Sequence, residues 1–297
     1  MKKILLFLFV AVFGLQLSTF AATTTPSNAA KWTTENGLKK VQEIGTNILS
    51  KNSLPTQVSF TVVETDEINA FASGDKELCV YTGLLNYIDN DAELAGIIGH
   101  EIGHIVNNHV AKQSIFASLT QTTIENSRLS STAKSNVSLA NDLVFLKVSR
   151  TDEYEADITG VDLMIKAGYN PLAMVSVLYK ISGNYFDFTS DHPSGDKRTM
   201  YLYNYLTYAY PGIVKAGYNS DSYKKFLAYA TPIVNERNAN PKKLEKFNKE
   251  QAKLKAKREK KLEKYKKSTN TMGWDASYNL LKSFAQAQQA TSSSSSK

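Results

Sequence analysis

The sequence predicts an α+β fold that is mainly helical, with a small antiparallel β-sheet beside one buried helix. Apolar residues recur at helical spacing in several long segments, and two shorter stretches, 57–64 and 69–81, have strand character. The composition, 42% hydrophobic and 21% charged, is ordinary for a globular protein and argues against a membrane bundle or a disordered chain. No internal repeat is visible, which argues against a tetratricopeptide-type binding module.

Residues 1–21 have the pattern of a signal peptide. Two lysines precede the apolar stretch 4–17, and the small residues Thr19 and Ala21 mark a cleavage site after Ala21. The alternative is an uncleaved membrane anchor. A spanning helix needs about 20 apolar residues, and this stretch is shorter. We therefore expect an exported protein, soluble after cleavage and periplasmic in a Gram-negative cell.

The first expected elements after the signal are a helix within residues 30–50, a strand at 57–64 and a hairpin over 69–81 that turns at Ser73-Gly74-Asp75. Cys79, the only cysteine, lies in the second strand of this hairpin. An intramolecular disulfide is therefore impossible, and this thiol is expected to be a buried core residue.

The next predicted helix begins after Asn90, which can cap it while Glu93 reaches back in a capping box. Its apolar residues lie nearly all round the helix, so it should be buried. Gly96, Gly99 and Gly103 each cost such a helix about 1 kcal/mol relative to Ala. Either the helix tolerates this weakness, or a neighbouring backbone or a substrate approaches closely there.

Later segments continue the helical pattern. A helix is expected from about 148 to 167, with Gly168 as its C-terminal left-handed residue. Asn170-Pro171 then begins a helix over 172–182, and the loop 191–198 leads into a tyrosine-rich helix.

Much of the net charge of +7 lies in residues 242–267, where lysine and arginine alternate with glutamate. This pattern is typical of a solvent-exposed, helix-prone segment; contact with an anionic membrane surface or an acidic partner is the functional alternative. No segment resembles a nucleic-acid-binding module.

The most informative motif is His100-Glu101-Ile102-Gly103-His104. Residues four apart lie on nearly the same face of a helix, so both imidazoles can reach one metal ion. Glu101 lies about 100° round the helix, where it can act as general base on a water molecule. Two surface histidines that happen to share a face are the alternative, which the surrounding isoleucines argue against.

A third ligand is expected from the helix that begins near Arg150. Glu153 and Asp157 share one face of that helix, and Glu155 points to the other side. The simplest assignment places Glu153 on the metal and lets Asp157 accept a hydrogen bond from the outer nitrogen of a ligand histidine. An acidic, solvated start of a helix is the alternative.

HEIGH at 100–104, EYEAD at 153–157 and DHPSGDKR at 191–198 together resemble the HtpX-like and CAAX-prenyl-endopeptidase family of zinc peptidases. The similarity covers about 69–198 and includes NAFASG and VYTGLL. It implies a zincin-like, gluzincin-type metallopeptidase domain with Glu153 as third ligand. The best-known members cross membranes, whereas this chain has no predicted span after its signal, so it is more similar to the soluble periplasmic BepA-like branch.

The resemblance also maps a His-Pro…Arg loop onto His192, Pro193 and Arg198. His192 either stabilises the oxyanion or occupies the open coordination position and holds the enzyme latent, and Arg198 is a second positive group for the oxyanion or a substrate carbonyl. Alternatively, His192 caps its loop and Arg198 forms a surface ion pair. His109, about 140° from His104 around the helix, is expected to be structural.

These patterns predict a zinc endopeptidase with one Zn²⁺ per chain that hydrolyses unfolded or misassembled cell-envelope proteins. The strand Ala70, Phe71 and Ala72 is the expected edge for an extended substrate. A zinc-containing chaperone or binding protein of the envelope, with latent or lost proteolysis, is the alternative. The predicted domains are a signal peptide (1–21), a metallopeptidase domain (30–235), a Lys/Glu-rich helical extension (236–284) and a disordered tail (285–297).

Overall fold

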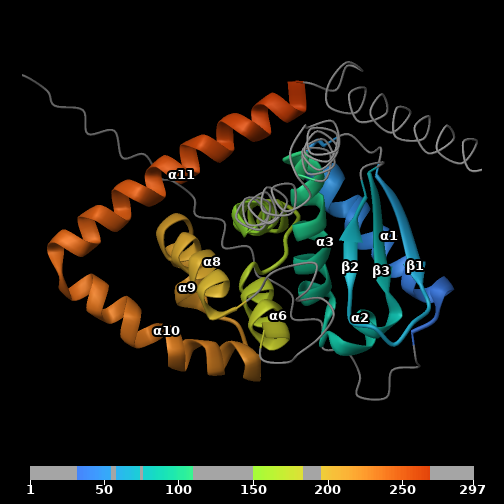
Figure 1. The fold of residues 1–297 in the computed structure, drawn as a ribbon, viewed down its shortest axis with the longest axis horizontal. Helices are drawn as coiled ribbons and strands as arrows, with labels where there is room; N and C mark the ends of the chain where they lie inside the picture. Colours follow the sequence, from blue (N-terminus) through green and yellow to red (C-terminus); the bar gives the residue numbers. More distant parts are fainter. Residues whose placement is uncertain (1–31, 55–57, 74–75, 110–149, 183–194, 268–297) are drawn as a thin grey trace, which may run out of the picture.

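The computed structural model describes residues 32–54, 58–73, 76–109, 150–182 and 195–267 (Figure 1). The signal peptide, His192 and the C-terminal tail lie outside these ranges. A helix without a label in Figure 1 runs through residues 150–166 and is called the 150–166 helix below. The labelled elements are α1 (Thr34–Lys51), β1 (Ser59–Val63), β2 (Ala70–Ala72), β3 (Glu77–Tyr81), α2 (Thr82–Tyr87), α3 (Asp91–Val106), α6 (Leu172–Ser182), α8 (Asp196–Ala209), α9 (Pro211–Ala216), α10 (Asp221–Ala239) and α11 (Pro241–Lys267).

The sheet has three strands in the order β1-β3-β2. β2 and β3 form the expected antiparallel hairpin, with Phe71 opposite Cys79. β1, however, pairs with β3 in parallel, with Ser59 opposite Glu77, so the prediction of a purely antiparallel sheet is wrong. The reason is that β2, although second in the chain, takes the outer edge and leaves the central place to β3. Cys79 is buried, as predicted.

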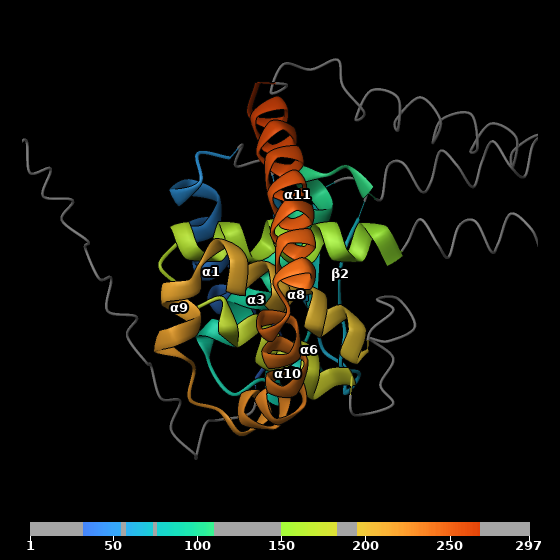
Figure 2. The same cartoon turned by 90° about the vertical axis from the view of Figure 1, so that its left-hand side faces the viewer.

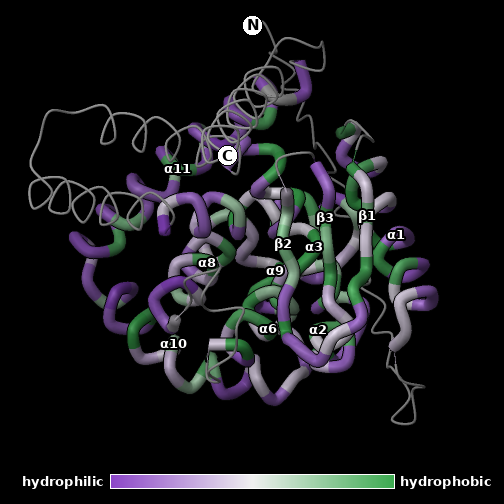
Figure 3. The backbone as a smooth tube through the Cα atoms, turned by 45° about the vertical axis from the view of Figure 1, so that its right-hand side comes forward, coloured by the Kyte–Doolittle hydropathy of each residue, from purple (hydrophilic) through white to green (hydrophobic). Residues whose placement is uncertain are grey.

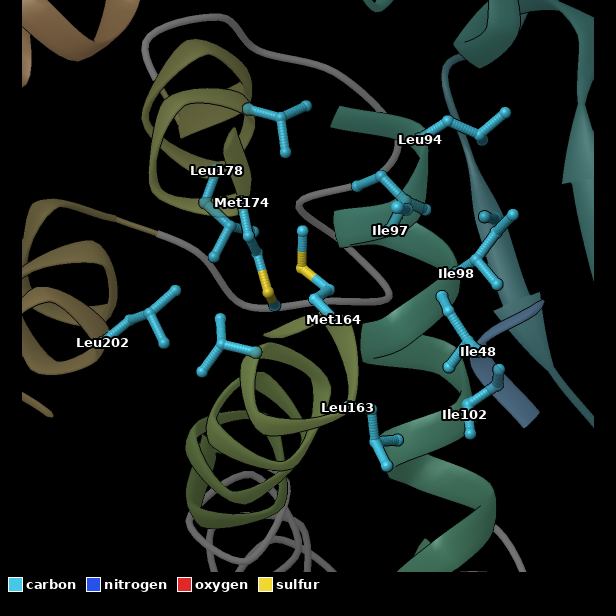
Figure 4. Packing of buried hydrophobic residues seen from close by; sticks show 14 of the residues in the cluster. Ile48, Leu94, Ile97, Ile98, Ile102, Leu163, Met164, Met174, Leu178 and Leu202 are labelled. Atoms are coloured by element: carbon cyan, nitrogen blue, oxygen red, sulfur yellow. The ribbon is translucent and has the colours of Figure 1, made fainter. Parts of the chain in front are cut away.

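α3 lies between the sheet and the helices α6, α8, α9 and α10, whereas α1 packs on β1 and α3 (Figure 1). As its all-round apolar pattern predicts, nearly the whole helix is buried. Figure 4 shows Ile98 and Ile102 on the side of Ile48 from α1, and Ile97 turned toward Met174 of α6. The motif residues 100–104 of α3 therefore lie in the middle of the hydrophobic core, where side-chain positions are tightly constrained.

The start of α3 confirms most of the predicted capping. The Asn90 side chain accepts hydrogen bonds from the N–H groups of Ala92 and Glu93, at 3.0 and 3.1 Å. Glu93 reaches back one residue further than expected: it accepts from the N–H of Asp89 at 3.0 Å. Its second oxygen accepts from the Ser176 hydroxyl of α6 at 3.0 Å, which explains the displacement and ties α3 to α6.

α10 and α11 form the C-terminal part of the described chain. α10 packs against α6. α11 follows α10 at an angle and runs back toward the core along α8 (Figures 1 and 2). The predicted domain limit at residue 235 falls inside α10. Hydrophilic residues dominate α11 (Figure 3). Within the described ranges, no helix combines the length and the apolar character needed to span a membrane.

Candidate metal centre

Small residues bring α3 and the 150–166 helix into backbone contact. A Cβ atom added at Gly103 would lie 2.5 Å from the carbonyl oxygen of Ala156, and one added at Gly99 would lie 3.1 Å from that of Gly160. One added at Gly160 would meet the backbone nitrogen of His100 at 2.9 Å. Of the two explanations for the helix glycines, close approach of a neighbouring backbone is therefore correct at Gly99 and Gly103. This backbone contact, called the seam below, brings residues of the 150–166 helix beside the histidines of α3.

His100, His104 and Glu153 converge across this seam, and all three are buried. The two Nε2 atoms lie 3.0 Å apart. The Glu153 oxygens lie 3.4 Å from Nε2 of His100 and 3.2 Å from Nε2 of His104. Tetrahedral ligands at about 2.0–2.1 Å from zinc are separated from each other by roughly 3.4 Å. The predicted ligand set therefore has both the chemistry and the spacing that zinc requires.

Glu101 projects from α3 beside this group. Its side chain is fully buried, and its Oε1 lies 4.0 Å from Nε2 of His100. This distance leaves the carboxylate close enough to hold a water molecule next to an ion bound by the three residues. The position is the one expected from the spacing along the helix.

Asp157 and Arg198 contact His100 and Glu153 of this group. Asp157 Oδ1 lies 2.9 Å from Nδ1 of His100. Arg198, at the start of α8, donates from Nε and Nη2 to the two oxygens of Asp157, both at 2.7 Å, and its Nη1 lies 2.7 Å from Glu153 Oε2. Burial raises the pKa of the Asp157 carboxyl, but Arg198 and His100 outweigh it and lower the pKa below its ordinary value.

Arg198 is 2% exposed, so the alternative of a surface ion pair is wrong. Its guanidinium lies beside the carboxylates of Asp157 and Glu153. The predicted contact with an oxyanion would have to be made in addition to these two pairs. That catalytic role stays a prediction. The other loop residue, His192, lies outside the described residues.

The two histidines of the pair have opposite pKa shifts. Burial lowers the pKa of His104, and the neighbouring His100 lowers it further, to about 3. Burial also lowers the pKa of His100, but hydrogen bonds with Asp157 and Glu153 outweigh it and raise the pKa to about 9. The surroundings therefore favour a proton on His100 and disfavour one on His104. A metal ion would replace this proton, since ligand histidines must be neutral.

His109 is the residue whose place the sequence argument missed. α3 ends at Val106 instead of continuing, and Asn108 has a left-handed φ of 55°. This turn brings the His109 ring back against His104, with their Nδ1 atoms 3.1 Å apart. The expected angle of about 140° assumed a continuous helix and does not apply. The signal that could have found this is the Asn107-Asn108 pair, since Asn tolerates the left-handed conformation that ends helices.

The predicted substrate strand forms β2, next to α3 and at the edge of the sheet. Asn69 and Ser73 bond to β3, through Asn69 O at 3.0 Å and Ser73 N at 2.8 Å. Because this pattern alternates, the backbone groups of Ala70 and Ala72 point away from β3. The N–H of Ala70 donates to the side chain of Asn69 at 2.9 Å.

Comparison with known proteins places this site in a family. The model of Peptidase family M48 matches residues 36–205, which is more than half of the chain. The chain belongs to peptidase family M48. This confirms at family level the resemblance carried by the HEIGH and EYEAD motifs. The match contains the whole histidine, glutamate, aspartate and arginine cluster, whereas α10 and α11 lie beyond it.

Several known proteins are similar to part of the chain. The mitochondrial metalloendopeptidase OMA1 of Arabidopsis thaliana is 36% identical over 49% of this chain and 31% of its own length. The beta-barrel assembly-enhancing protease of Escherichia coli K12 is 29% identical over 48% of this chain and 32% of its own length. Metalloprotease LoiP of the same strain is 28% identical over 52% and 66%. The first two relatives are thus matched over about a third of their length.

Proposed function

We propose that this M48 family member is a zinc-dependent endopeptidase whose metal is held by His100, His104 and Glu153. The observation that carries the proposal is the convergence of these three buried side chains from two helices, at separations that suit one tetrahedral ion. Three protein ligands leave a fourth position open, as in catalytic zinc sites. His/His/Glu is also a donor set that suits zinc better than magnesium or calcium, which prefer oxygen ligands.

The reaction requires a base, and Glu101 is the proposed one. Zinc, when bound, supplies Lewis acidity that polarises a carbonyl and lowers the pKa of water toward about 7. Glu101, buried beside the ligand histidines, takes the proton from the attacking water and delivers it to the leaving amine. Its exclusion from bulk water strengthens its electrostatic interactions at this point.

Asp157 and Arg198 are proposed to hold the ligands in place. A carboxylate only accepts hydrogen bonds, so the contact at 2.9 Å makes His100 Nδ1 the donor and turns the Nε2 lone pair toward the ion. Arg198 fixes Asp157 through two parallel bonds and holds one oxygen of Glu153. This arrangement favours a positioning role for Arg198. A role of His192 at the oxyanion or the open position is a separate prediction; unchanged turnover and metal affinity in His192→Ala would contradict it.

Unfolded or misassembled envelope proteins are the proposed substrates. The outward backbone groups of Ala72 on β2 can pair with an extended polypeptide, a binding mode that depends more on shape than on side chains. The Escherichia coli relative is a beta-barrel assembly-enhancing protease, and residues 1–21 of this chain have the pattern of a signal peptide; both support substrates in the cell envelope. Export to the periplasm is part of this proposal.

The test is degradation of unfolded casein by the purified mature chain. We expect cleavage that stops when a chelator removes the metal and recovers when zinc is returned. Glu101→Gln should bind zinc with unchanged affinity and lose at least about 100-fold in turnover, the lower range for loss of a general base. Glu259→Gln, the same change at an exposed position of α11, is the matched control and should cleave like wild type.

The same assay distinguishes the peptidase from the alternative, a zinc-containing binding protein. Casein binding without cleavage, unaffected by Glu101→Gln or by the chelator, would reject the peptidase and favour the zinc-containing binding protein. Cleavage that survives both treatments would reject the assigned site itself.

A further inference from the structure

A line of polar contacts connects α11 to the proposed metal ligand His104. Lys261 of α11 donates to Glu155 Oε2. That oxygen lies 3.2 Å from Nε2 of His109, and Nδ1 of His109 lies 3.1 Å from Nδ1 of His104. His109 is fully buried and Lys261 is half-buried, so these groups are largely shielded from water.

The direction of each hydrogen bond follows from the requirement at the metal. His104 must present an Nε2 lone pair, so the proton of its neutral ring is on Nδ1. Nδ1 of His109 faces this Nδ1–H at 3.1 Å, so it is the acceptor in this contact. His109 therefore carries its own proton on Nε2, where it donates to the Glu155 carboxylate. Every donor in the line meets an acceptor, and the line ends on the Lys261 ammonium.

We infer that His109 is a positioning residue that fixes the tautomer and the ring orientation of His104, and that Lys261 of α11 anchors it through Glu155. The inference rests on the proposed zinc site. Asp157 accepts a hydrogen bond from the outer nitrogen of His100 directly. For His104 the corresponding carboxylate is Glu155, which acts through the imidazole of His109.

A second metal site is the competing explanation for the same residues. One ligand atom each from His109, Asp152 and Glu155 lie within 4.8 Å of one another. An ion on Nε2 of neutral His109 would move its proton to Nδ1, directly against the Nδ1–H of His104. Because both rings cannot donate into one gap, the two groups cannot each hold an ion with neutral histidines. Glu155 is moreover already paired with Lys261.

α11 is secured close to this contact by Arg258. Its guanidinium carbon lies 4.1 Å from the ring centre of Tyr205 in α8, and its Nε lies 3.9 Å from Asp162 in the 150–166 helix. Three cations of α11, Lys257, Arg258 and Lys261, thus lie within 4.0 Å of two carboxylates of the helix that carries Glu153. Since α11 lies beyond the family match at 36–205, this support comes from a part of the chain that the family model does not include.

The experiment measures zinc affinity by chelator competition, with the metal content per chain and the thermal stability of the metal-free protein as further readouts. His109→Ala should weaken zinc binding by about 10–100-fold. His109→Asn places an amide oxygen near the position of Nδ1 and should recover most of the affinity. Lys261→Met should weaken binding by at least about twofold, the lower range for coupled neighbours. Lys260→Met, an exposed lysine on the same helix, is the matched control and should change nothing.

The effects should not add, because Lys261 acts through His109: in the His109→Ala background, Lys261→Met should have no further effect. Unchanged zinc affinity in His109→Ala, an Asn variant no better than Ala, or two zinc ions per wild-type chain would each overturn the inference and leave the proposed function standing. A wild-type chain that takes up no zinc would overturn both. If His109→Ala does not fold, the Asn and Lys261 variants decide the question.

Discussion

Gly103→Ala tests how the contact between two helices controls the metal site. The added Cβ would lie 2.5 Å from the carbonyl oxygen and 3.0 Å from the Cα of Ala156, both backbone atoms that cannot rotate away. To reach a tolerable contact, the 150–166 helix would have to retreat by roughly 0.5–0.9 Å. Glu153, one helical turn before Ala156, would move with it.

The two consequences have different magnitudes. For stability, overpacking costs about 1–3 kcal/mol, and replacing glycine inside a helix returns about 1 kcal/mol, so the net loss is small. For the metal, ligand distances tolerate only about 0.2 Å of error, so a shift several times larger should be felt strongly. We expect zinc affinity to fall at least about 10-fold while the metal-free protein stays folded.

The assay is chelator competition for zinc, alongside thermal unfolding of the metal-free protein. Gly212→Ala is the matched control, since that glycine is also helical and a Cβ there meets nothing within 4 Å. It should leave zinc affinity unchanged and stability equal or slightly raised. Wild-type zinc affinity in Gly103→Ala would refute the claim that close backbone contact sets the position of Glu153.

Three further outcomes are expected. Asp157→Asn should lower zinc affinity by about 10–100-fold, because the amide supports His100 without a charge; an unchanged dissociation constant in chelator competition would contradict this. Arg198→Met should destabilise the metal-free protein by about 3–5 kcal/mol, since it leaves the Asp157 and Glu153 carboxylates buried without their cation, and a thermal midpoint equal to wild type would show otherwise. Burial, followed by the Glu77 charge, raises the pKa of the Cys79 thiol to about 11. At pH 8 iodoacetamide should therefore label the folded chain at least roughly 100-fold more slowly than the unfolded one, and rapid labelling of folded protein would refute this assignment.

The sequence alone was sufficient for features that depend on neighbours within a few positions. The spacing of His100 and His104 defines a shared helix face, Asn90 caps α3, and β2 pairs with β3, the next strand along the chain. These outcomes follow from local geometry, which one helix or one turn determines without reference to the rest of the chain. The alternation of apolar residues likewise predicted which segments would be buried.

Features that join distant segments were decided by the tertiary structure. The parallel pairing of β1 with β3 depends on which strand takes the edge, and the partners of Arg198 depend on how α8 meets the 150–166 helix. His109 shows the limit most clearly: one left-handed residue, Asn108, turns it back onto His104 and toward α11. A pattern of residue types carries the chemistry of each group, but only packing brings groups from separate helices within the few ångströms at which they act.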